Sequence, residues 1–139
     1  MTNKTLLNEL KSLIEDHLDP SMFPYQKGNS IRIGKIVVRE SKKGFLIYDC
    51  QENTQIAITF SKMAALALAK SLSKGHNKLK EVLELDQTIQ KNYMDAVFFS
   101  HTLKISKDDF RKDVTLTRLE IAKARTARAK SALDSIIFR

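Results

Sequence analysis

The chain has 139 residues, of which 42% are hydrophobic and 29% are charged, with four glycines and two prolines. This composition is typical of a folded, helix-rich protein and excludes a disordered or collagen-like chain. The length fits one domain, or one compact unit with an appendage, and excludes a large multidomain enzyme. The single cysteine, Cys50, excludes an intramolecular disulfide and a cysteine-based zinc site, so we expect an intracellular, reducing setting.

The positive charge is concentrated in the second part of the chain. The net charge is +8, to which residues 1–60 contribute +1 and residues 61–139 contribute +7. Such an excess attracts nucleic acid or acidic protein surfaces. No segment of the sequence approaches the length of apolar residues that a bilayer requires, so we expect no membrane association.

The first part of the chain predicts a helix followed by a small sheet. Leucines and isoleucines recur at helical spacing between residues 3 and 18, Pro20 ends this helix, and residues 19–30 are expected to form a loop. Three β segments follow, at 31–38, 45–50 and 54–60, with a bulge expected at Gly34 and Lys35. Turns at 41–44 and 51–53 would join them into a three-stranded antiparallel meander.

The remaining residues predict helices only. Ser61 is expected to cap a buried helix that ends at Lys74 and Gly75. Residues 76–139 contain no Gly and no Pro, and we expect two long helices, at 77–104 and 107–137, with Ser106 and Asp109 resembling a capping box. A helix of the first length would be roughly 40 Å long and would project beyond the sheet. The same apolar stripes fit a hairpin that folds back and a domain-swapped pair.

The predicted fold class is therefore α+β: an N-terminal helix, a three-stranded antiparallel meander and a buried helix, followed by two long C-terminal helices that form a helical hairpin. We expect two units, a small α-β-β-β-α unit at 1–75 and a hairpin at 76–139 that packs on it and on another subunit. The apolar stripes of the hairpin are wider than one partner helix covers, which predicts a homo-oligomer.

No constellation of residues predicts catalysis, a cofactor or a metal site. The four glycines are scattered, so neither a phosphate-binding loop nor a dinucleotide fingerprint exists. Cys50 is interpreted as a small buried hydrophobe, not a nucleophile. Two acidic groups, which solvated or capped helix ends explain without a metal, are Glu15, Asp16, His17 and Asp19, and Asp108, Asp109 and Asp113. We therefore expect no enzyme activity.

Two basic sets are candidate contacts for DNA or RNA phosphates. Four cations without an acid lie between residues 122 and 130, where alanines would let a phosphate backbone approach closely. The alternatives are a solvated helix face, or cations that pair with acids on a neighbouring subunit. The nucleic-acid candidates are Arg118, Lys123, Arg125, Arg128 and Lys130 on the second long helix, and Arg32, Arg39, Lys42 and Lys43 near the sheet.

The layout of the chain also carries a resemblance. The segment Phe45-Leu46-Ile47-Tyr48-Asp49-Cys50, the alanine-rich stretch at 64–70 and the Gly-free helices that follow resemble short conserved proteins of unassigned function in T4-like marine cyanophages. This resemblance implies a viral protein, located in the host cytoplasm or in a virion. Because those proteins have no assigned activity, it implies no functional residues.

The sequence thus favours a non-enzymatic binding or assembly protein that uses its C-terminal helices for self-association or partner binding. The alternative is a nucleic-acid-binding accessory protein that contacts phosphates through the basic helix. An acidic protein is a further candidate partner. The candidate self-association residues are Leu85, Ile89, Tyr93, Phe99, Phe110, Val114 and Ile121.

Overall fold

The computed structural model describes residues 3–14, 25–27, 30–105 and 107–138 of the chain. The α+β class and the two long C-terminal helices are confirmed. Within the described residues the helices are α1 (Asn3–Ile14), α2 (Lys62–Ser73), α3 (Leu79–Ile105) and α4 (Asp109–Ile137). The strands are β1 (Tyr25–Lys27), β2 (Ser30–Ile33), β3 (Ile36–Ser41), β4 (Gly44–Asp49) and β5 (Thr54–Thr59).

The sheet is larger than the predicted three-stranded meander, and that prediction is wrong. The strands form one antiparallel sheet in the order β1-β2-β3-β4-β5, in which β1 has three residues and the other strands have four to six. Gly34 and Lys35 form a two-residue hairpin turn, not a bulge, because Ile33 pairs with Ile36 across it. Gly34 has a φ of +61°, the conformation that favours glycine at the first turn position. Strand β1 lies within the segment predicted as a loop.

The two predicted turns of the sheet are confirmed. Ser41 pairs with Gly44 across the first turn, and Asp49 pairs with Thr54 across the second. The buried carboxylate of Asp49 shapes the second turn, because its Oδ1 accepts hydrogen bonds from the backbone N–H groups of Gln51 (2.9 Å) and Glu52 (3.1 Å). Its Oδ2 lies 3.6 Å from Lys35 Nζ. The N–H groups of Glu52 and Gln51, with Lys35, hold the pKa of Asp49 below its usual value against the opposing effect of burial.

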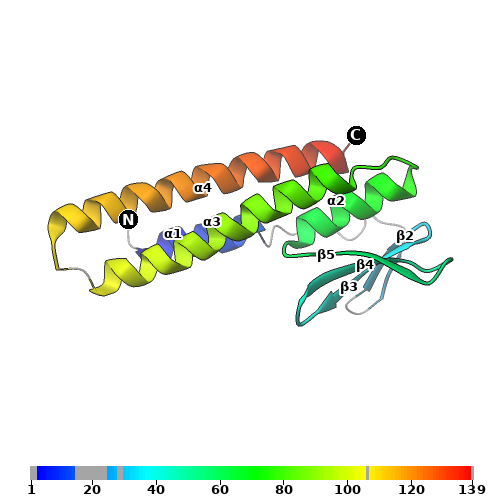
Figure 1. Cartoon of the computed structure of the whole chain (residues 1–139), viewed down its shortest axis with the longest axis horizontal. Coiled ribbons are helices and arrows are strands. Elements are labelled where there is room, and N and C mark those ends of the chain that lie inside the picture. Colours follow the sequence, from blue (N-terminus) through cyan, green and yellow to red (C-terminus); the bar gives the residue numbers. More distant parts are fainter. Residues whose placement is uncertain (1–2, 15–24, 28–29, 106, 139) are drawn as a thin grey trace.

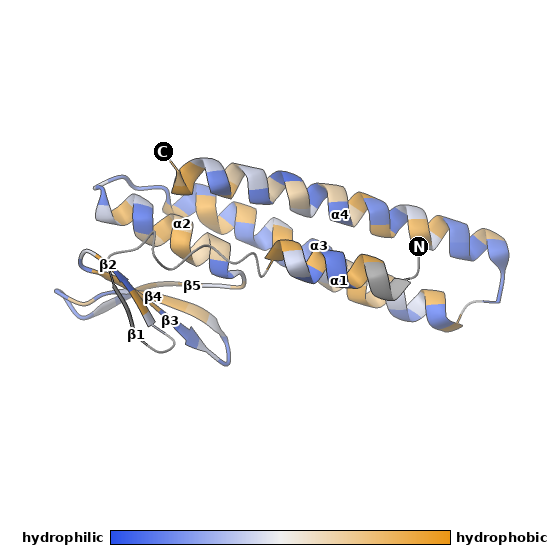
Figure 2. Ribbon diagram, turned by 180° about the vertical axis from the view of Figure 1, so that it is seen from behind, coloured by the Kyte–Doolittle hydropathy of each residue, from blue (hydrophilic) through white to orange (hydrophobic). Residues whose placement is uncertain are grey.

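Helix α2 is the buried layer between the sheet and the long helices, as predicted. Ser61 caps its N-terminus by accepting a hydrogen bond from the N–H of Ala64, and every residue from 63 to 69 is buried. At its C-terminus Gly75 has a φ of +81°, and the N–H groups of Gly75 and His76 bond to the carbonyls of Leu72 and Ser71. This Schellman pattern ends the helix. Figure 2 shows α2 as a largely hydrophobic helix next to the sheet.

Helices α3 and α4 run antiparallel as a hairpin, which is one of the two arrangements that the sequence allows (Figure 1). The N-cap of α4 is Asp108, which accepts a hydrogen bond from the N–H of Phe110, so the capping box predicted with Asp109 at its third helical position is wrong. The residues through which α4 packs inward are buried and alternate spacings of four and three, as in a coiled coil. We call them the inner seam: Thr115, Leu119, Ala122, Thr126, Ala129, Leu133 and Ile136.

The core has two hydrophobic clusters along the hairpin. The first joins the inner face of the sheet and α2 to the end of the hairpin near the sheet, through residues such as Ile47, Val82 and Leu133. The second joins α1 to the other end of the hairpin, through Leu6, Leu10, Ala96 and Leu119. Both clusters combine residues from either side of residue 75, and the division into two units stays a prediction. Figure 1 shows the far end of the hairpin projecting beyond the sheet.

The buried carboxylate of Asp86 connects α3 to the start of α2 through hydrogen bonds. Asp86, which is 5% exposed, accepts hydrogen bonds from Phe60 N (2.8 Å), Ser61 N (2.9 Å) and Ser61 Oγ (2.9 Å). The two backbone donors lie at the junction of β5 and α2, where neither element supplies an acceptor for them. A carboxylate that accepts several hydrogen bonds offsets the cost of its own burial.

We predict that Asp86→Ala lowers the free energy of unfolding by about 3 kcal/mol, because two backbone donors and the Ser61 hydroxyl lose a charged acceptor. Urea denaturation followed by circular dichroism measures this change. Glu84→Ala, at an exposed position of the same helix, is the matched control and should change stability by less than about 0.5 kcal/mol. Equal effects of the two variants would contradict the role assigned to Asp86.

Asp49 predicts a pH dependence of stability. Because its pKa is lower in the folded protein than its usual value of about 3.9, its stabilising contribution is complete above that value and is lost as the pH falls through the folded pKa. Asp49→Asn should therefore be less stable than wild type at pH 7 and should approach it on acidification. Thermal unfolding across this range tests the prediction, with Glu52→Gln as the control, and a constant difference at every pH would contradict it.

Candidate interaction surface

The structure separates the predicted self-association residues into two groups. Ile89 is 1% exposed and belongs to the first core cluster, against which Leu85 and Tyr93 also pack. Phe99 packs against the second cluster. These four side chains therefore stabilise the monomer. Phe110 and Ile121, in contrast, are 75% and 44% exposed, and Val114 is half-buried next to them along α4.

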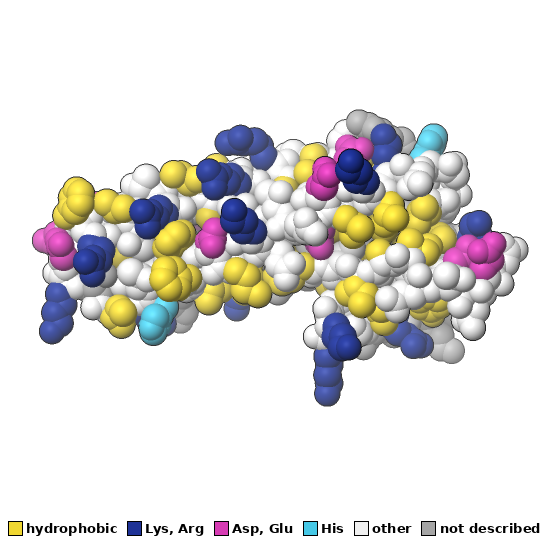
Figure 3. Space-filling view, in the orientation of Figure 1, with side chains coloured by type: hydrophobic (Ala, Val, Ile, Leu, Met, Phe, Trp, Pro, Cys, Tyr) yellow, Lys and Arg dark blue, Asp and Glu magenta, His cyan; other side chains and the backbone are white. Residues whose placement is uncertain are grey.

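Large exposed hydrophobic side chains gather on the hairpin. Of the eight that the described residues contain, six lie on α3 and α4 between residues 94 and 121. We use the name distal patch for these six exposed residues, which are spread over the distal half of both helices: Met94, Val97, Phe98, Ile105, Phe110 and Ile121. Figure 3 shows hydrophobic side chains interspersed with Lys and Arg on the half of the molecule that lies away from the sheet. Exposed apolar patches rimmed by charge are typical of interaction surfaces.

A groove between the two long helices contains part of the distal patch. It has a volume of about 450 Å³, and its walls include Phe98 and Thr102 from α3 and Phe110, Val114 and Arg118 from α4. The guanidinium of Arg118 lies 5.6 Å from the centre of the Phe99 ring, a cation–π contact that holds this cation at the α3 side of the groove. The groove thus combines apolar walls with two arginines, Arg111 and Arg118, and one acid, Asp108.

The predicted basic set on α4 is only partly available to a ligand. Arg118, Arg125 and Arg128 are exposed, and Lys130 is half-buried. Lys123 forms an ion pair with Glu9 of α1, and the hydrogen bond to the Glu9 carboxylate raises the pKa of Lys123. This lysine therefore joins α1 to α4 and is already neutralised within the chain.

The second basic set lies on the sheet. Arg32, Arg39, Lys42 and Lys43 are all exposed, and Arg32 Nε donates a hydrogen bond to the carbonyl of Gly34 at 2.9 Å. In Figure 1 the sheet lies on one side of α3 and α4 lies on the other. The fold therefore does not combine the two basic sets into one surface.

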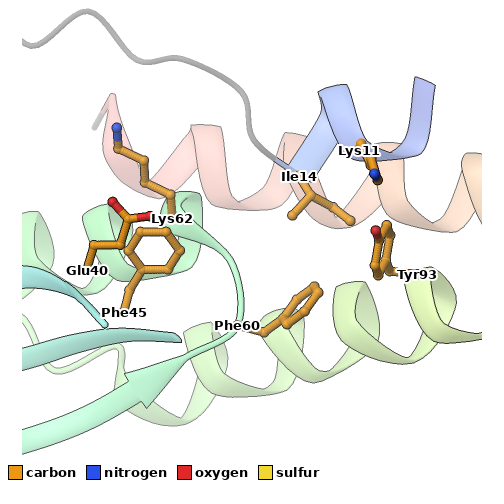
Figure 4. A pocket seen from close by; sticks show the side chains of 7 residues that line it. All are labelled: Lys11, Ile14, Glu40, Phe45, Phe60, Lys62 and Tyr93. Atoms are coloured by element: carbon orange, nitrogen blue, oxygen red, sulfur yellow. The ribbon is translucent and has the colours of Figure 1, made fainter. Parts of the chain in front are cut away.

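A separate cavity lies where α1, the sheet, α2 and α3 meet (Figure 4). Its volume is about 610 Å³, and its lining combines three aromatic rings, two lysines, one glutamate and one isoleucine from segments far apart in the sequence. The rings of Phe60 and Tyr93 lie 5.7 Å apart between centres. The lining residues are Lys11, Ile14, Glu40, Phe45, Phe60, Lys62 and Tyr93. No local sequence pattern connects these residues, so the sequence alone does not predict this cavity.

In the part of the chain that the structure describes, the candidate metal ligands do not lie together at one site. Within this part, no three His, Cys, Asp or Glu side chains are grouped as metal ligands. The acidic group at residues 15–19 lies outside the described residues. Asp108 acts as the helix cap described above. Cys50 is exposed, so its interpretation as a buried hydrophobe is wrong; it follows β4 in the turn that Asp49 shapes.

Comparison of the chain with protein-family models, with curated proteins and with solved structures finds no significant match. Among the helices of the described residues, none combines the length and the hydropathy that a membrane span requires.

Proposed function

We propose that this protein is a binding or assembly protein that associates with other copies of itself through the distal half of its helical hairpin. The observation that carries the proposal is the distal patch, which leaves six large hydrophobic side chains exposed on two neighbouring helices. Burying such side chains against a partner is favourable by roughly 25 cal/mol for each Å² of apolar surface removed from water. The resemblance to short cyanophage proteins supports a viral setting, in an infected cell or a virion.

The fold supports self-association because the patch belongs to a rigid element. The hairpin is fixed by the inner seam and by α1, so little conformational entropy is lost when its exposed face binds. The half of the hairpin near the sheet is already covered by α2. The distal half projects, and a second molecule can therefore reach it without contacting the sheet.

We expect light scattering coupled to size-exclusion chromatography to give a mass at least twice the 15.9 kDa of one chain. The double variant Phe98→Asp/Phe110→Asp should reduce this mass to that of a monomer, because it places charges within the patch. The thermal unfolding of the variant should still be cooperative, since both positions are exposed.

Ile58→Ser is the matched control, since Ile58 is 40% exposed but lies on β5, away from the patch. It should leave the oligomer intact. Ile89 is unsuitable for this test, because an Asp in the core would unfold the chain. A wild-type protein that stays monomeric at high concentration would contradict the proposed function.

The second candidate function is nucleic-acid binding through α4. It is favoured by the exposure of Arg125 and Arg128 on a stretch of α4 that contains no acid from residue 121 to 133. Arginine side chains of this kind contact phosphates without regard to base sequence.

If this second function holds, the fluorescence anisotropy of labelled duplex DNA or RNA should rise with protein concentration, and the affinity should fall steeply with salt. Arg125→Glu/Arg128→Glu should weaken this binding at least tenfold. Arg32→Glu, on the sheet, separates a contribution of α4 from a general effect of net charge. Absence of binding at low salt would exclude the second function.

A further inference from the structure

The solvent face of α4 carries a second coiled-coil pattern, opposite the inner seam. Its members alternate spacings of four and three residues, and all are exposed except Val114, which is half-buried. We call them the outer seam: Phe110, Val114, Thr117, Ile121 and Ala124. In the notation of a seven-residue repeat, Val114 and Ile121 occupy a positions, and the other three occupy d positions. A straight helix can present both seams because they lie on opposite sides of it.

Opposite charges flank the outer seam. Arg111, Arg118 and Arg125 recur every seven residues along one side, at e positions, whereas Asp113 and Glu120 recur along the other side, at g positions. All five side chains are exposed. Within the described residues, none of them lies within ion-pair distance of an opposite charge, although Arg118 contacts the Phe99 ring and Glu120 contributes to raising the pKa of Lys123.

This separation of charge distinguishes between the two ways in which a second α4 could pack. In a parallel pair of helices, a g residue of one helix faces the e residue that lies five positions later on the other. The sequence spacing meets this requirement twice, since Asp113 would face Arg118 of a second copy and Glu120 would face its Arg125. An antiparallel pair would place arginine against arginine along one flank and acid against acid along the other, which is unfavourable.

We propose that a second copy of this chain docks on the outer seam with its α4 parallel to the first, in a two-fold symmetric dimer held by these reciprocal ion pairs. The inference rests on the proposed self-association and specifies its geometry. The β-branched residues Val114 and Ile121 match the a positions of two-stranded parallel coiled coils, whereas the d positions hold Phe110, Thr117 and Ala124 in place of the leucines typical of that pattern. The ion pairs favour the parallel over the antiparallel orientation of the two helices, and burial of Phe110, Val114 and Ile121 contributes most of the binding free energy.

The fold leaves room for this dimer. Helix α1 packs on the other side of α4, where Glu9 contacts Lys123 and Leu10 belongs to the same cluster as Leu119. The sheet lies beyond α3, away from the solvent face of α4 (Figure 1). The next a position is Arg128, which would face Arg128 of the second copy, so the parallel contact ends before it.

Two experiments test this dimer, both in the full chain with the substitution Cys50→Ser, which removes the single native cysteine. The first is charge reversal, which tests the ion pairs. Arg118→Glu/Arg125→Glu leaves Arg111 in place but makes acid face acid at both predicted pairs, and Asp113→Arg/Glu120→Arg makes both flanks basic. Each variant alone should raise the dimer dissociation constant at least tenfold. An equimolar mixture of the two should restore a dimer that contains one chain of each kind, because every facing pair then has opposite charges. Thermal unfolding of each variant verifies that the chain stays folded.

Disulfide crosslinking tests the orientation. A parallel dimer places Val114 against Val114 and Ile121 against Ile121 of the second copy, so Val114→Cys and Ile121→Cys should each crosslink under mild oxidation. An antiparallel dimer can bring at most one of these positions onto the two-fold axis. Glu84→Cys, exposed on α3 and distant from the outer seam, is the control that should not crosslink.

The outcomes separate this inference from the proposed function. A dimer that dissociates on charge reversal, reassociates on mixing and crosslinks at both positions supports the parallel arrangement. A dimer that is insensitive to charge reversal, or that crosslinks at one position or neither, overturns the parallel arrangement and leaves self-association through the distal patch in place. A wild-type chain that is monomeric overturns both.

Discussion

The packing of α4 against its neighbours along the inner seam is the constraint on which the rest of the structure depends. Small residues such as Ala122, Thr126 and Ala129 occupy this seam and let neighbouring helices approach closely. The hydroxyl of Thr126 donates a hydrogen bond to the carbonyl of Ala122 within the same helix, so its burial leaves no unpaired donor. This packing holds α4 against α1, α2 and α3, and so it determines which sides of the hairpin are covered and which side faces solvent.

The two ends of the hairpin differ in the elements that they contact and in the hydrophobic surface that they expose. Near the sheet, the hairpin covers α2, and Asp86 joins it to the junction of β5 and α2. Far from the sheet, α1 covers one side of the hairpin, and the other side exposes Phe98, Phe110 and Ile121. One end therefore stabilises the fold, whereas the projecting end presents a surface that a monomer leaves exposed to water.

The excess of positive charge has more than one explanation in this structure. Lys123 neutralises Glu9 within the chain, and the spacing of Arg118 and Arg125 matches that of Asp113 and Glu120 for pairing between two copies. The remaining exposed cations of the described residues are spread over the sheet, as at Arg32 and Arg39, and over the helices, as at Lys91 and Arg128. Net charge alone therefore does not indicate a nucleic-acid partner, because a basic helix in a symmetric dimer can satisfy much of its charge with its own acids.

The sequence by itself determined the features that depend on neighbouring residues: the α+β class, the Ser61 cap, the Gly75 helix end, the turns at 41–44 and 51–53, and the two long helices. The sequence did not predict the number of strands, because Gly34 and Lys35 fit both a bulge and a tight turn. Only the pairing of strands across the sheet distinguishes these two structures. The candidate surface was predicted in part, through Phe110, Val114 and Ile121. Only the tertiary structure decided which apolar side chains, such as Ile89, the monomer buries, because an apolar stripe on a helix does not specify what packs against it. The charges that flank α4 can likewise be assigned to an interface only when the solvent face of α4 is known.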